Sequence, residues 1–225
     1  PRAARGGPLR PGRPIADPGP DRGLRQGSTR LSGTGSLYAN AYTWSIVSGP
    51  NGAVPATGAT LTDASAAQPT FNVATDGTYV LSLVVGNGSA QSAPTSLTLV
   101  VNNALTPAPG AIRFSDIKAV LQDGFKCQGC HGPASTLPAP IHFTNADRDG
   151  DGIAGSATDD AWYYAEVRSR VNFAEIAASD LLRKPQGFHH RGGQGAGFDT
   201  SVAPGQPGRA KYDLFLNWAL NGAPQ

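Results

Sequence analysis

The sequence predicts a two-domain protein in which an antiparallel β-sandwich is followed by an all-α domain with long loops. Three observations support this prediction. Between residues 33 and 103 apolar and polar residues alternate with period two, and this stretch contains no lysine or arginine. After residue 111 the apolar residues recur at helical spacing instead. The chain contains 29 glycines and 19 prolines among 225 residues, which predicts short elements and many loops.

Residues 1–32 are expected to form an extended arm. The first thirty residues carry seven arginines and two aspartates, and few aromatic or β-branched side chains. Such a segment buries too little apolar surface to offset its ordering entropy. An arginine-rich arm can bind nucleic acid or anionic lipid. However, the whole chain has a net charge of +2, so the residues after the arm have a net charge of −3. They contain no cluster of basic residues that would recognise nucleic acid. We therefore expect a solvated or subunit-contacting tail and no nucleic-acid partner.

Residues 33–103 are expected to form the sandwich, from the runs YTWSIV, PTFNV, GTYVLSLVV and SLTLVV. Together with their flanking turns, these runs resemble immunoglobulin-like modules of the PKD and related families. The resemblance implies that Trp44 is the core tryptophan and that Asp76-Gly77-Thr78-Tyr79 forms a tyrosine corner. The chain lacks the cysteine pair of antibody domains and the WDFGDG sequence of typical PKD repeats. Modules of this kind space, adhere or assemble, so this domain is not expected to be catalytic.

Residues 104–111, rich in proline, are expected to be a linker, and residues 112–225 a helical domain. Ser115 is the expected N-cap of the first of three helices. Their buried stripes are expected to comprise Ile117, Val120 and Leu121; Trp162, Tyr163, Val167 and Val171; and Tyr212, Phe215, Trp218 and Leu220. A few helices with long loops bury little surface, and a prosthetic group would supply the missing core.

The motif CQGCH at residues 127–131 predicts one covalently bound haem c. In Cys-x-x-Cys-His the two thiols add to the haem vinyl groups and the histidine binds the iron. A redox dithiol would be expected in a thioredoxin-like βαβ setting, and structural zinc needs further ligands at matching spacing. Neither pattern accompanies the motif. We therefore expect Cys127 and Cys130 as thioether anchors and His131 as the proximal ligand.

Residues 111–225 resemble class I cytochrome c domains, with FSDIKAVLQDGFKCQGCH matching the first helix and haem motif and YDLFLNWALNGAP the last helix. The resemblance implies that these helices cross beside the haem and that the activity is electron transfer to redox partner proteins rather than enzymatic catalysis. Because covalent haem attachment occurs outside the cytoplasm, it also implies an extracytoplasmic location. The family's sixth iron ligand is usually a methionine before the last helix, and this chain contains no methionine.

A histidine is the expected substitute for that methionine, and the chain has four: His131, His142, His189 and His190. The segment LLRKPQGFHHRGG resembles the KP…HxGG loop of some bacterial cytochrome c domains, which implies His190 as the sixth ligand. A one-residue shift in that alignment would select His189. His142 is the third candidate, beyond a proline-rich turn after His131. The alternative is that His189 and His190 are exposed loop residues and the iron is five-coordinate.

The segment DRDGDG places Asp147, Asp149 and Asp151 at alternate positions before Gly152, as at the start of many calcium loops. An EF-hand would have a glutamate at its twelfth position, where this chain has Thr158. The spacing therefore predicts a short non-EF calcium loop, with a solvated acidic turn as the alternative.

Three functions remain open from the sequence. The first is an extracytoplasmic electron carrier, in the periplasm, at the cell surface or secreted, with a bis-histidine iron and an Ig-like module for positioning or assembly. The second is a haem peroxidase or gas sensor with an open sixth position. The third, which combines with the first, is a subunit of a homo-oligomer or filament in which haems of neighbouring subunits relay electrons. No apolar run reaches the roughly 18 residues that a membrane span needs, so none is expected.

Overall fold

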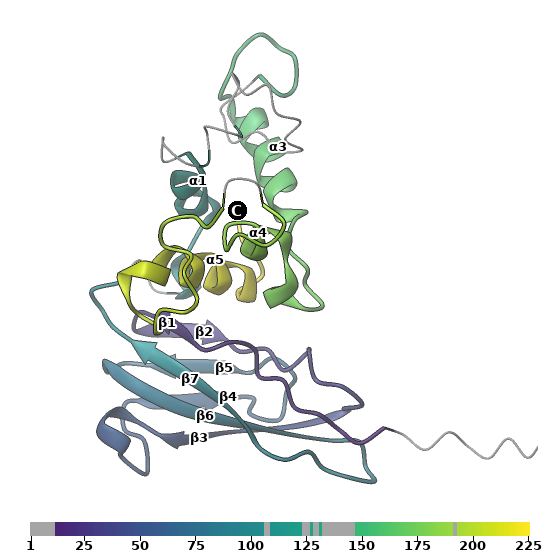
Figure 1. The fold of residues 1–225 in the computed structure, drawn as a ribbon, viewed down its shortest axis with the longest axis vertical. Coiled ribbons are helices and arrows are strands. Elements are labelled where there is room, and N and C mark those ends of the chain that lie inside the picture. The colour runs from purple at the N-terminus through teal and green to yellow at the C-terminus, as the bar shows by residue number, and fades with distance from the viewer. Residues whose placement is uncertain (1–11, 106–108, 123–126, 128–130, 132–146, 191–192) are drawn as a thin grey trace, which may run out of the picture.

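The computed structural model describes residues 12–105, 109–122, 127, 131, 147–190 and 193–225. Its N-terminal part is rich in β-structure and its C-terminal part is helical (Figure 1), which confirms the predicted order of the two parts. Among the described residues, no helix is long and apolar enough to cross a membrane.

The β domain contains two sheets. The four-stranded sheet has the order β1-β7-β6-β3 and the three-stranded sheet the order β2-β5-β4. All strand pairs are antiparallel except β1 with β7. The strands are β1 (Arg22–Leu24), β2 (Gly27–Arg30), β3 (Ala41–Ser48), β4 (Ala59–Thr62), β5 (Thr70–Val73), β6 (Gly77–Gly86) and β7 (Thr95–Val101).

The core of the β domain combines apolar residues of the runs that the sequence predicted to be strands with Ala16, Leu24 and Leu31 from the segment before them. Trp44 is 3% exposed and lies opposite Leu83 on β6. The fully buried residues of the other predicted runs are Phe71, Tyr79, Leu81, Leu83, Val85, Leu97 and Leu99. The Tyr79 hydroxyl donates to the carbonyl of Thr75 at 3.0 Å. This bond to the backbone a few residues upstream confirms the predicted tyrosine corner.

The prediction of an extended arm over residues 1–32 is wrong for residues 22–30, which form β1 and β2. All three residues of β1 are buried, and Gly23 lies opposite Val100 of β7. The segment has few apolar side chains, so its composition did not predict burial. Its order comes from pairing with sheet edges and from side chains of the helical domain. Residues 1–11 lie outside the described residues.

The helical domain contains α1 (Phe114–Gln122), α3 (Ala157–Arg168), α4 (Asp180–Arg183) and α5 (Ala210–Leu220). Short 3₁₀ helices are η1 (Pro50–Gly52) in the β domain, η2 (Pro109–Ala111) at the linker, and η3 (Ile176–Ala178) and η4 (Pro207–Arg209) further on. The three helices that the sequence predicted correspond to α1, α3 and α5. The four-residue α4 is too short to produce a periodic signal.

Two details of the predicted helices are wrong. Ser115 is not the cap of α1, because the helix already begins at Phe114 and the carboxylate of Asp116 instead accepts from the Arg113 N–H at 2.8 Å. Trp162 was expected in the buried stripe of α3 but is 59% exposed. Its neighbour Tyr163 occupies that stripe, and adjacent residues of a helix do not share a face.

Helix α5 lies between the rest of the helical domain and strands β1 and β2 (Figure 1). Its residues from Tyr212 to Leu220 are all buried. A helix that is buried on every side must pack against partners on every side. Here those partners come from both domains, so α5 belongs to the helical core and to the domain interface at once.

Candidate functional site

The structure brings two of the predicted ligands, His131 and His190, to the same place. Their imidazole ring centres lie 6.1 Å apart and the ring planes differ by 15°. Both side chains are half-buried. The two residues are far apart in sequence, since His131 has helical backbone after α1 whereas His190 lies in the loop after α4.

This spacing suits one metal ion between two imidazoles. A metal–imidazole bond is about 2 Å long and the ring centre lies roughly 1 Å behind the bonding nitrogen, so two imidazoles on opposite sides of a metal have centres roughly 6 Å apart. Ring planes in direct stacking contact would lie closer, at roughly 3.5–4 Å. The His131 and His190 side chains therefore fit a bis-histidine donor set.

A hydrogen bond orients the His190 ring. Its Nδ1 lies 3.1 Å from the carbonyl oxygen of Gly193, so Nδ1 is the protonated donor. In return, the Gly193 N–H donates to the His190 carbonyl at 3.1 Å, and Gly193 has φ +66, a conformation that favours glycine. In the neutral form of such a ring the remaining nitrogen, Nε2, carries the lone pair that a metal needs. Metal-binding histidines commonly have this kind of second hydrogen bond.

The other candidate ligands are placed differently. His189 is exposed, has φ +49, and accepts a hydrogen bond from Lys184 Nζ at its carbonyl at 3.4 Å. Of the two adjacent histidines, the structure therefore brings His190, and not His189, into a ring pair with His131. His142 lies outside the described residues.

Cys127 begins the motif that His131 ends, and both residues have helical backbone. Cys127 is half-buried and packs against the apolar core of the helical domain. It is also close to Tyr163: burial raises the pKa of the Tyr163 hydroxyl, the guanidinium of Arg148 opposes this, and a thiolate at Cys127 adds to it. Cys130 lies outside the described residues.

Aromatic side chains of three helices meet at Phe114 and position the start of α1. The Phe114 ring packs edge-on against Tyr163 at 5.3 Å and Tyr164 at 5.4 Å, both on α3. It also lies 6.3 Å from the Trp218 ring on α5. Aromatic contacts of this type add to the stability gained from burial. They fix the position of α1 against α3 and α5.

The predicted acidic loop brings its three carboxylates together. Asp147, Asp149 and Asp151 are exposed and offer oxygen atoms within 4.8 Å of one another. Asp147 accepts from the Gly150 and Gly152 N–H groups, both at 2.7 Å. The Asp151 N–H lowers the pKa of Asp149, but desolvation and the neighbouring carboxylates outweigh it and the net shift is upward. Acidic clusters of this kind are not specific to a metal, so the calcium site stays a prediction.

The loop is tied to the helix that follows it by Asp159. Its side chain is buried and accepts from the N–H groups of Arg148 at 2.5 Å and Ser156 at 2.9 Å. The Ser156 hydroxyl in turn accepts from the Asp159 N–H at 3.1 Å, which completes a capping box at the start of α3. The Arg148 N–H bond lowers the pKa of Asp159 despite some desolvation. Asp159 is therefore occupied by the backbone and is not part of the exposed cluster.

A buried polar network between the domains was missed by the sequence analysis. It joins Arg22 and Gly23 of β1 to Arg209, Asp213 and Asn217 at and within the last helix. A signal was available: Asp213, Asn217 and Asn221 recur every four residues in an otherwise apolar helix, which predicts a polar stripe facing a polar partner.

No family model matches the chain, and no curated protein matches it. Among solved structures, the chain is similar to a structure described as the PKD domain from KIAA 1837 protein, at 30% identity over 41% of this chain and 90% of that one, with a TM-score of 0.34. It is also similar to a nucleoside hydrolase-related hypothetical protein from Saccharophagus degradans, at 15% identity over 40% of this chain and 26% of that one, with a TM-score of 0.31. The β-rich N-terminal region thus has a PKD domain among its structural neighbours, and the C-terminal part is helical.

Proposed function

We propose that this protein is an extracytoplasmic c-type cytochrome that carries one haem and transfers electrons. Cys127 and Cys130 would attach the haem covalently, and His131 and His190 would bind its iron from opposite sides. The observation that carries the proposal is the His131–His190 ring pair at 6.1 Å, since one of these residues ends a haem-attachment motif and the other lies far from it in sequence.

The haem would supply a one-electron redox centre, and the residues of this chain would set its properties. The thiols of Cys127 and Cys130 would hold the haem through two thioether bonds, formed by redox-neutral addition of thiol to vinyl group. His131 and His190 would bind its iron, and the hydrogen bond from His190 Nδ1 to the Gly193 carbonyl would keep the His190 ring in place. Two imidazoles in place of histidine and methionine favour a lower reduction potential. A filled sixth position also resists external ligands, in contrast to a peroxidase or gas sensor.

The β domain would position or assemble the cytochrome, the role that its resemblance to PKD modules implies. Redox partner proteins are required because a single haem can only receive and pass on an electron. In a homo-oligomer or filament, electrons could pass from subunit to subunit. Because each chain would carry one haem, such a relay requires assembly to bring the haems of neighbouring subunits close together. A calcium ion held by Asp147, Asp149 and Asp151 is a further part of the proposal, with its own test below.

The proposal is tested by the intact mass and visible spectra of the protein produced together with a haem-attachment system outside the cytoplasm. We expect the mass of the chain plus one haem under denaturing conditions, and low-spin spectra in both oxidation states. The matched control is the double variant Cys127→Ala and Cys130→Ala, which should lose covalent haem. A wild-type chain without covalent haem would overturn the proposal. A covalent but high-spin haem would overturn the bis-histidine assignment and favour the peroxidase or sensor alternative.

A further inference from the structure

We propose that strand β1 and helix α5 form a polar clasp that joins the two domains into one rigid unit, so that the β domain sets the orientation of the helical domain and does not act as a flexible tether. The clasp is defined here as Arg22 and Gly23 with Arg209, Asp213 and Asn217. This inference goes beyond the proposed function and does not depend on haem.

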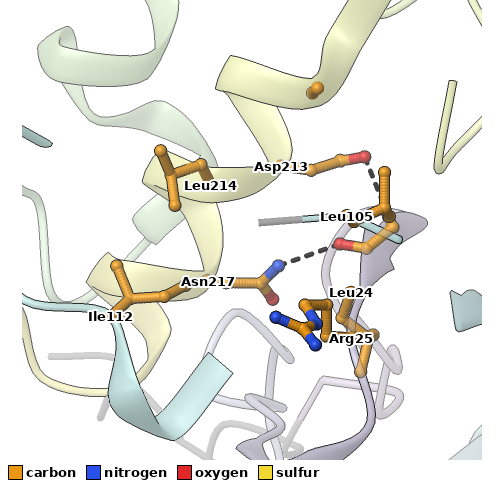
Figure 2. Close-up of a pocket in the computed structure, with 9 residues that line it drawn as sticks. Leu24, Arg25, Leu105, Ile112, Asp213, Leu214 and Asn217 are labelled. Atoms are coloured by element: carbon orange, nitrogen blue, oxygen red, sulfur yellow. Dashed lines mark hydrogen bonds between the residues drawn. The ribbon is translucent and has the colours of Figure 1, made fainter. Parts of the chain in front are cut away.

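The peptide groups of Gly23 are bound by two side chains one helical turn apart. The Gly23 N–H donates to Asp213 Oδ2 at 2.9 Å, and the Gly23 carbonyl accepts from Asn217 Nδ2 at 2.9 Å. Figure 2 shows Asp213 and Asn217 extending from α5 toward this strand. Because β1 is an edge strand, its outer N–H and C=O groups would otherwise need another strand or water. Helix α5 therefore takes the place of a neighbouring strand.

Arg22 lies at the centre of the clasp and is 1% exposed. Its Nε donates to Asn217 Oδ1 at 2.9 Å, and its Nη2 donates to the Arg30 carbonyl at 3.2 Å. Burial lowers the pKa of Arg22 to about 10, and the nearby charge of Asp213 opposes this shift. A buried cation is tolerated when its hydrogen bonds are satisfied, and removing a partner is costly. One of the partners of Arg22 belongs to the β domain and the other to α5.

An ion pair fixes the other carboxylate oxygen of Asp213. Arg209 Nε lies 3.2 Å from Asp213 Oδ1, and the two side chains are 6% and 5% exposed. The NH2 group of the same guanidinium donates to the carbonyl of Asp21, immediately before β1, at 2.7 Å. Burial raises the pKa of Asp213, although Arg209 and the N–H groups of Gly23 and Gly205 act against it.

The same helix face continues onto β2. Asn221, one turn beyond Asn217, accepts from the Arg30 N–H at 3.2 Å and lies 3.3 Å from the Thr29 hydroxyl. The polar stripe of α5 therefore binds residues 21–30, largely through their backbone. Together with the pairing of β1 with β7 and of β2 with β5, these contacts order the segment that its composition predicted to be extended.

The packing around the clasp leaves almost no free volume. The cavity lined by Leu24, Ile112 and Leu214 beside the polar groups measures about 10 Å³, which is room for one water molecule at most. A Cβ atom at Gly23 would lie 2.5 Å from the nitrogen of Gly205 and 2.8 Å from Asp213 Oδ2. The fit therefore requires glycine at position 23.

Helix α5 makes the two domains cooperative because each depends on it. Its polar stripe binds β1 and β2, while Phe215 and Trp218 are fully buried in the helical core. Movement of α5 away from β1 would break the hydrogen bonds of the clasp. Loss of those bonds would in turn remove the contacts that hold one side of α5. Elements that share their packing in this way open together as one unit. The bound outer edge of β1 is also closed to strand addition, so assembly by that route has to use another edge.

The test compares Gly23→Ala with Gly86→Ala by hydrogen–deuterium exchange of the full-length protein, read by mass spectrometry on peptides. A Cβ at Gly86 would make ordinary contacts of 3.4 Å or more, so Gly86→Ala is the matched control. In Gly23→Ala we expect the amides of β1 and of α5 to exchange faster together, by about tenfold or more, with little change in β3 and β6. Gly86→Ala should leave both regions as in the wild type.

A second variant, Asn217→Leu, keeps the number and branching of the side-chain heavy atoms and removes the bonds to Arg22 and Gly23. It gives the same reading if Gly23→Ala does not fold. The proposal is overturned if α5 exchange changes less than about threefold while β1 exchange rises, because the domains would then open separately. Exchange on peptides needs no haem. A protein without covalent haem would contradict the proposed function but could still show coupled exchange of β1 and α5. The two proposals can therefore be refuted independently.

Discussion

Replacing His190 by alanine is expected to open the sixth coordination position of the iron. The ring centres of His131 and His190 are 6.1 Å apart, a distance that would leave a gap of roughly 4 Å between ring nitrogens turned toward a shared iron. That gap holds two metal–nitrogen bonds of about 2 Å each. A methyl group at position 190 cannot bridge it, and His189 is exposed with its backbone held in a left-handed turn.

The assay is visible and electron paramagnetic resonance spectroscopy of the ferric protein. We expect His190→Ala to change from low-spin to high-spin and to regain the low-spin spectrum when imidazole is added. Because the internal ligand no longer competes, cyanide should bind at least about tenfold more tightly, equivalent to 1.4 kcal/mol. His190→Met should instead keep six ligands and raise the reduction potential.

His189→Ala is the matched control, since it alters the adjacent histidine and leaves the His190–Gly193 hydrogen bond in place. Its spectrum should match the wild type. A His190→Ala protein that remains low-spin, or a His189→Ala protein that becomes high-spin, would refute the assignment of the sixth ligand.

Four further outcomes are expected. Tyr79→Phe removes the hydroxyl bond of the tyrosine corner and should cost about 1 kcal/mol in urea unfolding, and no measurable cost would contradict that role. Ser156→Ala removes the cap of α3 and should cost about 1 kcal/mol by the same measurement, with an unchanged midpoint as the contrary result. Asp213→Asn places an amide N–H among donors and should cost about 2 kcal/mol. Because burial raises the pKa of Asp213, the folded wild type holds a proton there that the unfolded chain has already lost. Its free energy of unfolding should therefore fall as pH rises from about 3.8 through the pKa of the folded state. Asp213→Asn should lack this pH dependence, and an equal pH dependence in both proteins would show that Asp213 does not cause it. If the acidic loop binds calcium, millimolar calcium should raise the melting temperature of the wild type but not of Asp149→Asn, and equal shifts would exclude the site.

Elements with their own periodicity could be predicted from the sequence. The strands β3, β5, β6 and β7 contain alternating apolar residues, and α5 contains apolar residues at helical spacing, so these elements were predicted from their own pattern. Strand β4, with the sequence ATLT and no buried residue, was not predicted. Strands β1 and β2, with the sequences RGL and GSTR, contain no such pattern. Their order depends on pairing with β7 and β5 and on contacts with the last helix, such as Arg22 with Asn217, and local composition carries no information on those partners.

The residues of the candidate site likewise fall into those that the local sequence predicts and those that only the tertiary structure brings together. The residues of CQGCH are adjacent in sequence, and their chemistry follows from their spacing. The choice among the other histidines depended on a loop resemblance, because the distance between His131 and His190 is a property of the tertiary structure. The prediction that Trp162 is buried on α3 was wrong because successive residues of a helix are rotated by about 100° around its axis. Trp162 therefore cannot share a face with its buried neighbour Tyr163.

The loop that carries His190 and the clasp are connected through one helix. The Tyr212 N–H at the start of α5 donates to the Gly197 carbonyl at 3.0 Å, and the Phe198 ring packs edge-on against Phe215 at 5.3 Å. These contacts attach the end of the histidine loop to α5, while Asp213 and Asn217 attach the same helix to β1. A ligand on a loop is positioned only as well as the element that supports it. In this protein that support includes a strand of the β domain, so we expect the β domain to contribute to the placement of the loop that carries His190.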